Sequence, residues 1–308
     1  MAAPAPTQAL DPPDTLSRWI PSRVARGFFL ALLSGLFFTF LNASVKELAS
    51  DMPPLLVAWG HWLSGVALIG AYLAWRVGLA GMRTQDMKLH CFRGLFHTTG
   101  YGLWYEAVVW LPLATMAALG FTGPIFVTVG AVVFLRETVQ WRRWAGVAVG
   151  FAGMLVIVRP GIVEMNSGMW MMLAAVPLMA ASNLVAKVVS GRDKPAVVVF
   201  WQSVVGALCF TPVGIWYWQT PTLPQLGLFL AAGFFGTVGY FFITWAYRLL
   251  DISALQSITF LAIVWAALMD VAVWGKTADI WTFVGAAIIV ASTTYIAHRE
   301  AAAGGKKA

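Results

Sequence analysis

Residues 111–160 read LPLATMAALGFTGPIFVTVGAVVFLRETVQWRRWAGVAVGFAGMLVIVRP, which is two apolar spans joined by an arginine-rich connection. The spans, 113–135 and 144–158, are long enough, or nearly so with flanking tryptophans, to cross about 30 Å of hydrocarbon as helices. A unit of the same kind recurs near the C-terminus, over 251–296. The recurrence predicts a chain built from repeated membrane-spanning helices.

The composition of the whole chain indicates an all-α integral membrane protein. Of the 308 residues, 60% are hydrophobic and only 11% are charged, which leaves too few charges for a soluble surface. The net charge of +7 comes from short loops between apolar spans, so it indicates membrane orientation and no nucleic-acid partner. The only cysteines, Cys91 and Cys209, lie in apolar stretches. We therefore expect no disulfide framework, metal site or cofactor.

Hydropathy predicts ten transmembrane helices. They lie near 26–46, 54–76, 90–110, 113–135, 142–158, 168–189, 195–217, 225–248, 252–274 and 280–298. If the N-terminus is inside, 17 of the 20 Lys and Arg residues fall in inner segments. The three in outer segments are Lys46, Arg159 and Lys276. This asymmetry predicts a protein of the inner (plasma) membrane with both termini cytoplasmic. The first span is too long for a signal-peptide core, so we expect it to be retained.

An internal repeat relates the two halves of the chain. A shift of 139 residues aligns 91–157 with 230–296 without gaps, and a shift of 141 aligns the first helix of each half. Matched positions include Gly94/Gly233, Gly100/Gly239, Tyr101/Tyr240, Phe121/Phe260, Asn42/Asn183 and Lys46/Lys187. Because each repeat holds five helices, the second half must enter the membrane from the opposite face. Inverted repeats of this kind are typical of secondary transporters, whose substrate site lies between the halves.

Several motifs resemble the EamA branch of the drug/metabolite transporter (DMT) superfamily. They are HCFRG at 90–94, LPLA at 111–114, GP at 123–124, FLRE at 134–137, WRRWAG at 141–146, GFAG at 150–153 and RPG at 159–161. The resemblance implies two inverted five-helix halves, with the fifth and tenth helices peripheral and the others framing a central cavity. In the second half, Lys276 stands where the family usually has a Glu equivalent to Glu137. His61 stands where the family commonly has Arg.

The predicted division of the chain follows from the spans and the repeat. Residues 1–25 form a disordered or interfacial N-terminal segment, 26–160 the first repeat, 161–298 the second repeat, and 299–308 a flexible tail.

Polar and aromatic side chains within the spans are the candidates for a substrate site, because intramembrane ionisable groups are costly. The third span carries a polar-aromatic stripe that includes Arg93, His97 and Tyr101. An aromatic packing seam is the alternative for this stripe, and a neutral histidine bonded between helices is the alternative for His61. The expected cavity residues are His61, Trp62, Arg93, His97, Tyr101, Trp104, Tyr105, Gln202, Tyr240, Thr244, Gln256 and Trp265.

Other residues are candidates for gating, coupling and bending. Either carboxylate of Glu106 and Asp270 is a candidate proton carrier, with a solvated acid near a helix end as the alternative. The inverted symmetry predicts matched gates at the two cavity ends, although plain interhelical hydrogen bonds also explain the asparagines. The gate residues are Asn42, Lys46, Asn183 and Lys187, and the predicted hinges are Pro124, Pro177 and Pro212.

The sequence favours a secondary transporter that moves a small polar or amphipathic metabolite, amino-acid-like or flavin- or nucleoside-like, by alternating access. Proton coupling is left open. A passive facilitator and a membrane-embedded lipid-modifying enzyme are the alternatives. The sequence contains no GxxxxGK[ST], GxSxG or HExxH motif, so we expect no enzymatic activity and no catalytic residues. The expected partners are a small-molecule substrate and the lipid bilayer, with the chain a monomer or a weak homodimer.

Overall fold

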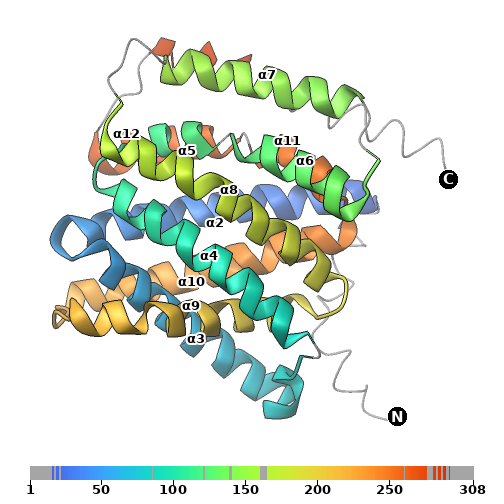
Figure 1. Ribbon diagram of the computed structural model, residues 1–308. Helices are drawn as coiled ribbons and strands as arrows, with labels where there is room; N and C mark the ends of the chain where they lie inside the picture. The colour runs from blue at the N-terminus through green and yellow to red at the C-terminus, as the bar shows by residue number, and fades with distance from the viewer. Residues whose placement is uncertain are drawn as a thin grey trace, which may run out of the picture.

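The helices of the computed structural model follow the predicted spans closely (Figure 1). The structure describes residues 16, 19–20, 22–84, 86–120, 122–138, 141–159, 165–259 and 261–275, with isolated positions between 280 and 291. The helices are α2 (Arg23–Asp51), α3 (Pro54–Val77), η2 (Leu79–Met82), α4 (Met87–Val108), α5 (Leu113–Gly120), α6 (Gly123–Leu135), α7 (Trp141–Val158), α8 (Ser167–Ser190), α9 (Pro195–Trp216), α10 (Leu223–Leu249), α11 (Ile252–Thr259) and α12 (Ala262–Trp274). The described residues contain no strand. The chain is therefore all-α.

Five of these helices, α2, α3, α8, α9 and α10, are long and apolar enough to cross a membrane. They contain between 22 and 29 residues, which is about 33–44 Å at 1.5 Å per residue. Large apolar side chains on the outside of the bundle, such as Phe134 at 77% exposed and Leu208 at 66%, would face lipid. The chain is a multi-pass membrane protein.

The fourth and ninth predicted spans are each divided into two helices. The sequence predicts an interruption at Pro124 in the fourth span and an uninterrupted helix in the ninth. α5 ends at Gly120 before α6 begins at Gly123, and α11 ends at Thr259 before α12 begins at Ala262. Pro124 explains the first division, because proline lacks an N–H and is favoured at the start of a helix. No proline or glycine explains the second division. It lies 139 residues later in the chain, at the position equivalent to the first.

The two halves interlock with the symmetry that the repeat predicts. α2 of the first half packs along α10 of the second, and α8 of the second packs along α4 of the first. A Cβ atom on Gly239 would lie 2.8 Å from the Phe38 ring, and one on Gly100 would lie 3.0 Å from Met179. These glycines are repeat equivalents, and so are Phe38 and Met179. The chain is thus built from two inverted repeats in contact.

α7 lies at the edge of the bundle, as the family resemblance implies for the fifth helix (Figure 1). Its main neighbours are α5 and α11. Most of the predicted tenth span, 280–298, lies outside the described residues.

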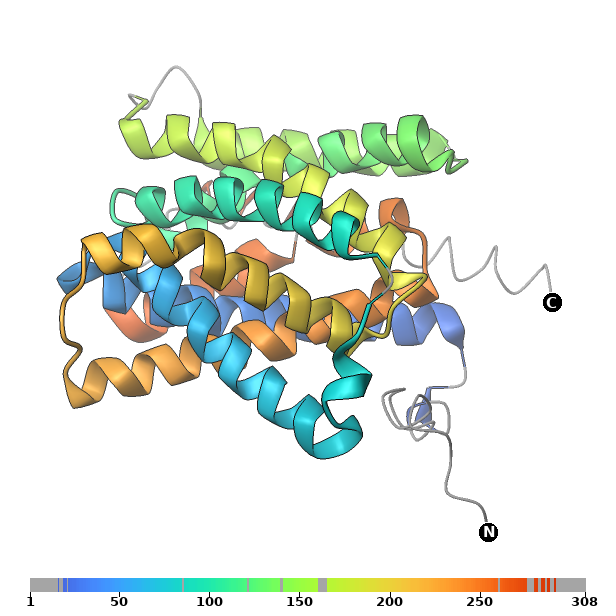
Figure 2. The same ribbon diagram turned by 60° about the horizontal axis from the view of Figure 1, so that its bottom comes forward.

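The chain crosses the bundle in alternating directions, so Lys46 and Lys187 lie at opposite ends of it. We call these the Lys46 end and the Lys187 end. The Lys46 end holds the last residues of α2, α4 and α12 and the first residues of α5 and α8. The Lys187 end holds the connection between α3 and α4 beside the connection between α8 and α9 (Figure 2).

Candidate functional site

A cavity of about 270 Å³ lies between the two halves. Its walls come from α2, α4, α5, α8, α10, α11 and α12. The volume is near the lower limit for small-molecule sites, which range over about 300–1,000 Å³. Its aromatic lining residues are Phe38, Tyr101, Trp104, Tyr240, Tyr247 and Trp265.

Four of these aromatic rings form a continuous wall. The ring centroids of Phe38 and Tyr240 are 4.8 Å apart, those of Tyr240 and Tyr101 are 6.5 Å apart, and those of Tyr101 and Trp104 are 6.2 Å apart. Such a wall offers both ring faces and ring edges to a planar ligand.

The described lining of the cavity contains no charged side chain. Two hydroxyl groups of the lining donate hydrogen bonds to backbone carbonyls of the protein. Ser34 donates to the Gly239 carbonyl of α10 at 2.8 Å, and Thr39 donates to the Gly35 carbonyl of α2 at 3.0 Å. An ionised ligand would find no counter-charge on this wall, and burying an unpaired charge is costly. The lining therefore suits an uncharged ligand.

The predicted gate asparagines lie on the cavity wall, one from each half. Asn42 comes from α2 and Asn183 from α8. Within the part of the chain that the structure describes, neither side chain has a hydrogen-bond partner.

A polar network lies beside the cavity, between α4 and the second half. Arg93 donates to the side-chain oxygen of Gln202 and, at 3.3 Å, to the Val198 carbonyl. The Gln202 amide nitrogen lies 2.9 Å from His97 Nε2, and the Tyr240 hydroxyl lies 3.2 Å from the same atom. The network therefore ties α4 to α9 and α10.

A second buried pair supports the aromatic wall from behind. The Tyr105 hydroxyl lies 2.6 Å from His61 Nδ1, which ties α4 to α3. Trp62 packs against His97 and Tyr240, with ring centroids 5.1 and 5.8 Å away. Trp62 and His97 thus pack against Tyr240 without lining the cavity themselves.

The predicted cavity residues divide into two groups. Tyr101, Trp104, Tyr240 and Trp265 lie on the cavity wall. The remaining described side chains lie in the helix interfaces, a different place from the one expected. For those on α4, the reason is that the polar-aromatic stripe turns toward α9 and α10 as well as toward the cavity. The side chains in the interfaces are His61, Trp62, Arg93, His97, Tyr105, Gln202 and Thr244. The side chain of Gln256 lies outside the described ones.

The two predicted gate lysines bind backbone carbonyl oxygens at helix ends. Lys46 Nζ donates to the Leu111 carbonyl at 2.6 Å, just beyond α4. Lys187 Nζ donates to the Tyr247 and Leu250 carbonyls, each at 2.6 Å, at the end of α10. Leu111 and Leu250 are repeat equivalents. Each lysine thus neutralises the negative end of the third helix of its own half.

Carboxylates cap the broken helices in a matching way. Asp270 is 5% exposed, and its Oδ2 accepts from the Ala114 N–H at 3.1 Å, at the start of α5. Glu137 Oε1 accepts from the Ile252 N–H at 3.3 Å, at the start of α11. Asp270 Oδ1 has no partner among the described residues. Glu106, the other candidate acid, lies half-buried on α4 and outside the cavity wall.

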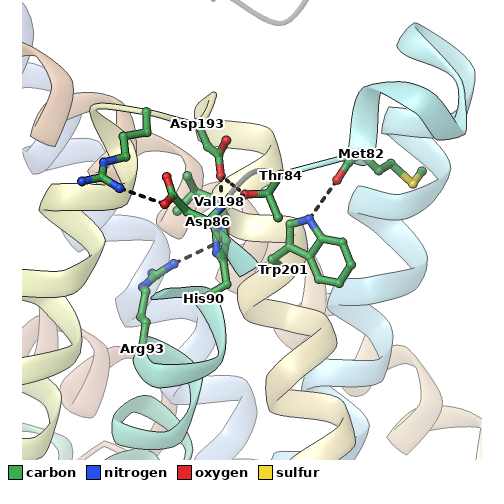
Figure 3. Close-up of polar contacts among 9 residues, drawn as sticks. Met82, Thr84, Asp86, His90, Arg93, Asp193, Val198 and Trp201 are labelled. Carbon is green, nitrogen blue, oxygen red and sulfur yellow. Dashed lines mark hydrogen bonds and ion pairs between the residues drawn. The ribbon is translucent and has the colours of Figure 1, made fainter. Parts of the chain in front are cut away.

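A cluster that sequence reasoning missed joins the halves at the Lys187 end (Figure 3). Asp193 Oδ2 accepts from the Thr84 hydroxyl at 2.5 Å and lies 2.8 Å from His90 Nε2. Arg192 donates to Asp86 Oδ1 at 2.8 Å. We call these five residues the polar clasp. The repeat gives Met52 in place of Asp193 and Phe229 in place of His90, so the clasp has no equivalent at the Lys46 end.

The predicted hinge prolines occupy two kinds of position. Pro124 lies in the first turn of α6, directly after the division of the fourth span. Pro177 lies inside α8 and Pro212 inside α9.

Known proteins resemble this chain in sequence and in fold. The model of the EamA-like transporter family matches residues 25–159 and again 166–297. The chain belongs to the EamA-like transporter family. The two matches correspond to the two inverted repeats of the structure.

Relatives of this EamA-like transporter carry different named substrates. A riboflavin transporter of Rhizobium johnstonii is 29% identical, over 91% of this chain and 93% of the relative. An S-adenosylmethionine uptake transporter of Rickettsia bellii is 28% identical, over 73% of this chain and 78% of the relative. A pseudopaline exporter of Pseudomonas aeruginosa is 26% identical, over 86% of this chain and 93% of the relative. The family and these relatives make the chain a transporter of small metabolites.

A solved crystal structure has the same fold as this EamA-like transporter. It superimposes with a TM-score of 0.69 at 20% sequence identity and covers 91% of this chain and 98% of its own.

Proposed function

We propose that the chain is a secondary transporter that moves an uncharged, planar aromatic metabolite of the flavin type across the inner membrane by alternating access. One observation carries the proposal: the cavity between the inverted halves has an aromatic wall and no charged side chain in its described lining. An isoalloxazine ring is planar and uncharged, and it would gain stacking energy on this wall.

S-adenosylmethionine is the second candidate, because a relative is named for its uptake. Its sulfonium group would be stabilised by aromatic rings. Its carboxylate would have no cationic partner on the described wall, and an unpaired buried charge is costly. We therefore favour a flavin-like substrate.

Proton coupling through Asp270 extends the proposal. The carboxylate is buried, it caps the start of α5, and α5 supplies part of the cavity wall. Lys46 and Glu47 also lie at this end, and both contact Trp274 of α12. A proton taken up by Asp270 would weaken the cap on α5 and so alter the cavity wall.

Uptake into proteoliposomes tests the substrate. Radiolabelled riboflavin and S-adenosylmethionine are offered separately to vesicles with the protein and to empty vesicles. We expect labelled riboflavin to enter protein-containing vesicles faster than empty ones. Unlabelled riboflavin, added in excess, should reduce this uptake. Uptake of S-adenosylmethionine alone would favour the second candidate, and no uptake of either would contradict the proposal.

A matched pair of acid variants tests the coupling. Under an imposed proton gradient, we expect D270N to exchange riboflavin across the membrane but to lose accumulation against a gradient. E106Q, which changes the acid outside the cavity wall, should accumulate it as the wild type does. Accumulation by D270N at the wild-type level would contradict coupling through Asp270 and favour a different route or a passive facilitator.

A further inference from the structure

We infer that Asn42 and Asn183 are the two polar contacts that recognise the substrate, one from each half, and that the substrate carries a neutral hydrogen-bonding group toward each end of its planar core. This inference rests on the proposed function and adds the recognition residues and the chemistry that they require.

The two asparagines occupy equivalent places in the inverted halves. They match in the internal repeat, and both side chains line the cavity. Each lies four residues before its lysine, which is about 6 Å along a helix. Because Lys46 and Lys187 mark opposite ends of the bundle, Asn42 lies toward one end of the cavity and Asn183 toward the other.

Three other polar groups of the cavity wall are engaged by the protein. Ser34 and Thr39 donate to backbone carbonyls, and the Tyr240 hydroxyl contacts His97. The two asparagine amides have no partner within the described residues, although each offers a carbonyl acceptor and two N–H donors. Polar side chains left without a partner in a largely apolar cavity are expected to bind a ligand or water.

The pair also defines the kind of ligand. An amide offers an acceptor beside a donor, so its best partner offers a donor beside an acceptor, as an imide or ureide edge does. A carboxylate or phosphate would instead bring a charge that nothing on the described wall balances. The aromatic wall of Phe38, Tyr240 and Tyr101 lines the same cavity as the asparagines. The expected ligand is therefore elongated, with a stacked centre and neutral polar ends.

An inverted pair fits transport as well as binding. When one half rocks against the other, a substrate held by one amide from each half keeps a polar contact in both orientations of the cavity. A substrate held by only one half would have no polar contact with the other half during this movement.

The experiment measures riboflavin affinity by quenching of its fluorescence on the purified, detergent-solubilised full chain. The variants are N42A and N183A, and the control is T99A, an exposed α4 residue outside the cavity. We expect each asparagine variant to bind riboflavin about 10- to 100-fold more weakly, as for loss of a hydrogen bond in a buried site, and the control to bind as the wild type does. The isosteric N42D and N183D, which bring a charge to the same place, should also bind more weakly.

A ligand analogue makes the test specific. 3-Methylriboflavin lacks the imide N–H, so the wild type should bind it more weakly than riboflavin. In whichever asparagine variant has lost the imide contact, the two ligands should bind equally. Wild-type affinity in N42A and N183A would overturn this inference alone, whereas failure of the wild type to bind riboflavin would overturn the proposed function and this inference with it.

Discussion

Most polar side chains buried among these helices are engaged by the protein itself. Gln202 is hydrogen-bonded to both Arg93 and His97 between α4 and α9, and Lys46 and Lys187 bind helix-end carbonyls. Such bonds raise the stability of the bundle because a buried donor without a partner is costly. The two cavity asparagines are exceptions to this pattern.

The lysine caps lead to the first prediction. K46M and K187M should each lower the free energy of unfolding by about 1–3 kcal/mol, because each removes charge-assisted hydrogen bonds to helix-end carbonyls. The measurement is unfolding of the purified protein in mixed micelles by added SDS. K88M, at an exposed position of α4, is the control and should unfold as the wild type does. Equal stability of K46M and K88M would contradict the capping role.

The polar clasp leads to the second prediction. The side chains of His90 and Asp193 are 0% and 13% exposed, whereas those of Arg192 and Asp86 are 56% and 23% exposed. Double-mutant cycles with alanine should give a coupling energy of about 0.5–3 kcal/mol for the buried pair and at most about 1 kcal/mol for the exposed pair. The more exposed pair serves as the internal control, and a larger coupling there would contradict the structure.

Helix breaks and prolines are the features of individual elements that bear on movement. The first break has a local cause in Pro124, but the second follows only from its equivalence to the first. Sequence reasoning predicted an interruption at Pro124 but a single helix over 252–274, because hydropathy measures how apolar a stretch is and does not register a break within it.

Pro177 carries the prediction at this scale. Proline cannot donate to the carbonyl four residues earlier, so α8 lacks one backbone hydrogen bond opposite Leu173 and bends more easily. P177A should restore that bond, leave riboflavin affinity within about twofold and slow uptake into proteoliposomes. P124A, at a helix start where no such bond is lost, is the matched variant and should transport near the wild-type rate. Unchanged uptake by P177A would contradict the hinge.

At the scale of the whole molecule, much of the fold could be predicted from the sequence, but the site could be predicted only in part. Hydropathy placed the spans, and the 139-residue shift matched the bounds of α5 and α6 to those of α11 and α12. The stripe on α4 predicted which face of the helix is polar, but not which part of that face lines the cavity. Tyr101 lines the cavity, whereas Arg93 and His97 contact α9. The polar clasp joins residues near 84–90 to 192–193 from different halves, and neither segment is distinctive alone.

Orientation is the next prediction at this scale. In a background with Cys91 and Cys209 replaced by serine, T222C at the Lys46 end should react with a membrane-impermeant maleimide added to intact cells. R192C at the Lys187 end should react only after the membrane is opened, because the positive-inside rule places that end in the cytoplasm. The opposite labelling pattern would contradict the orientation.

The central claim is that the cavity between the halves carries the substrate, and filling that cavity tests it most directly. A117W places a large side chain on the α5 wall, whereas A174W makes the same change at an exposed α8 position outside the cavity. The measurement is riboflavin uptake into proteoliposomes that contain equal amounts of folded protein. The account predicts uptake near the empty-vesicle level for A117W and near the wild-type level for A174W, and wild-type uptake by A117W would contradict it.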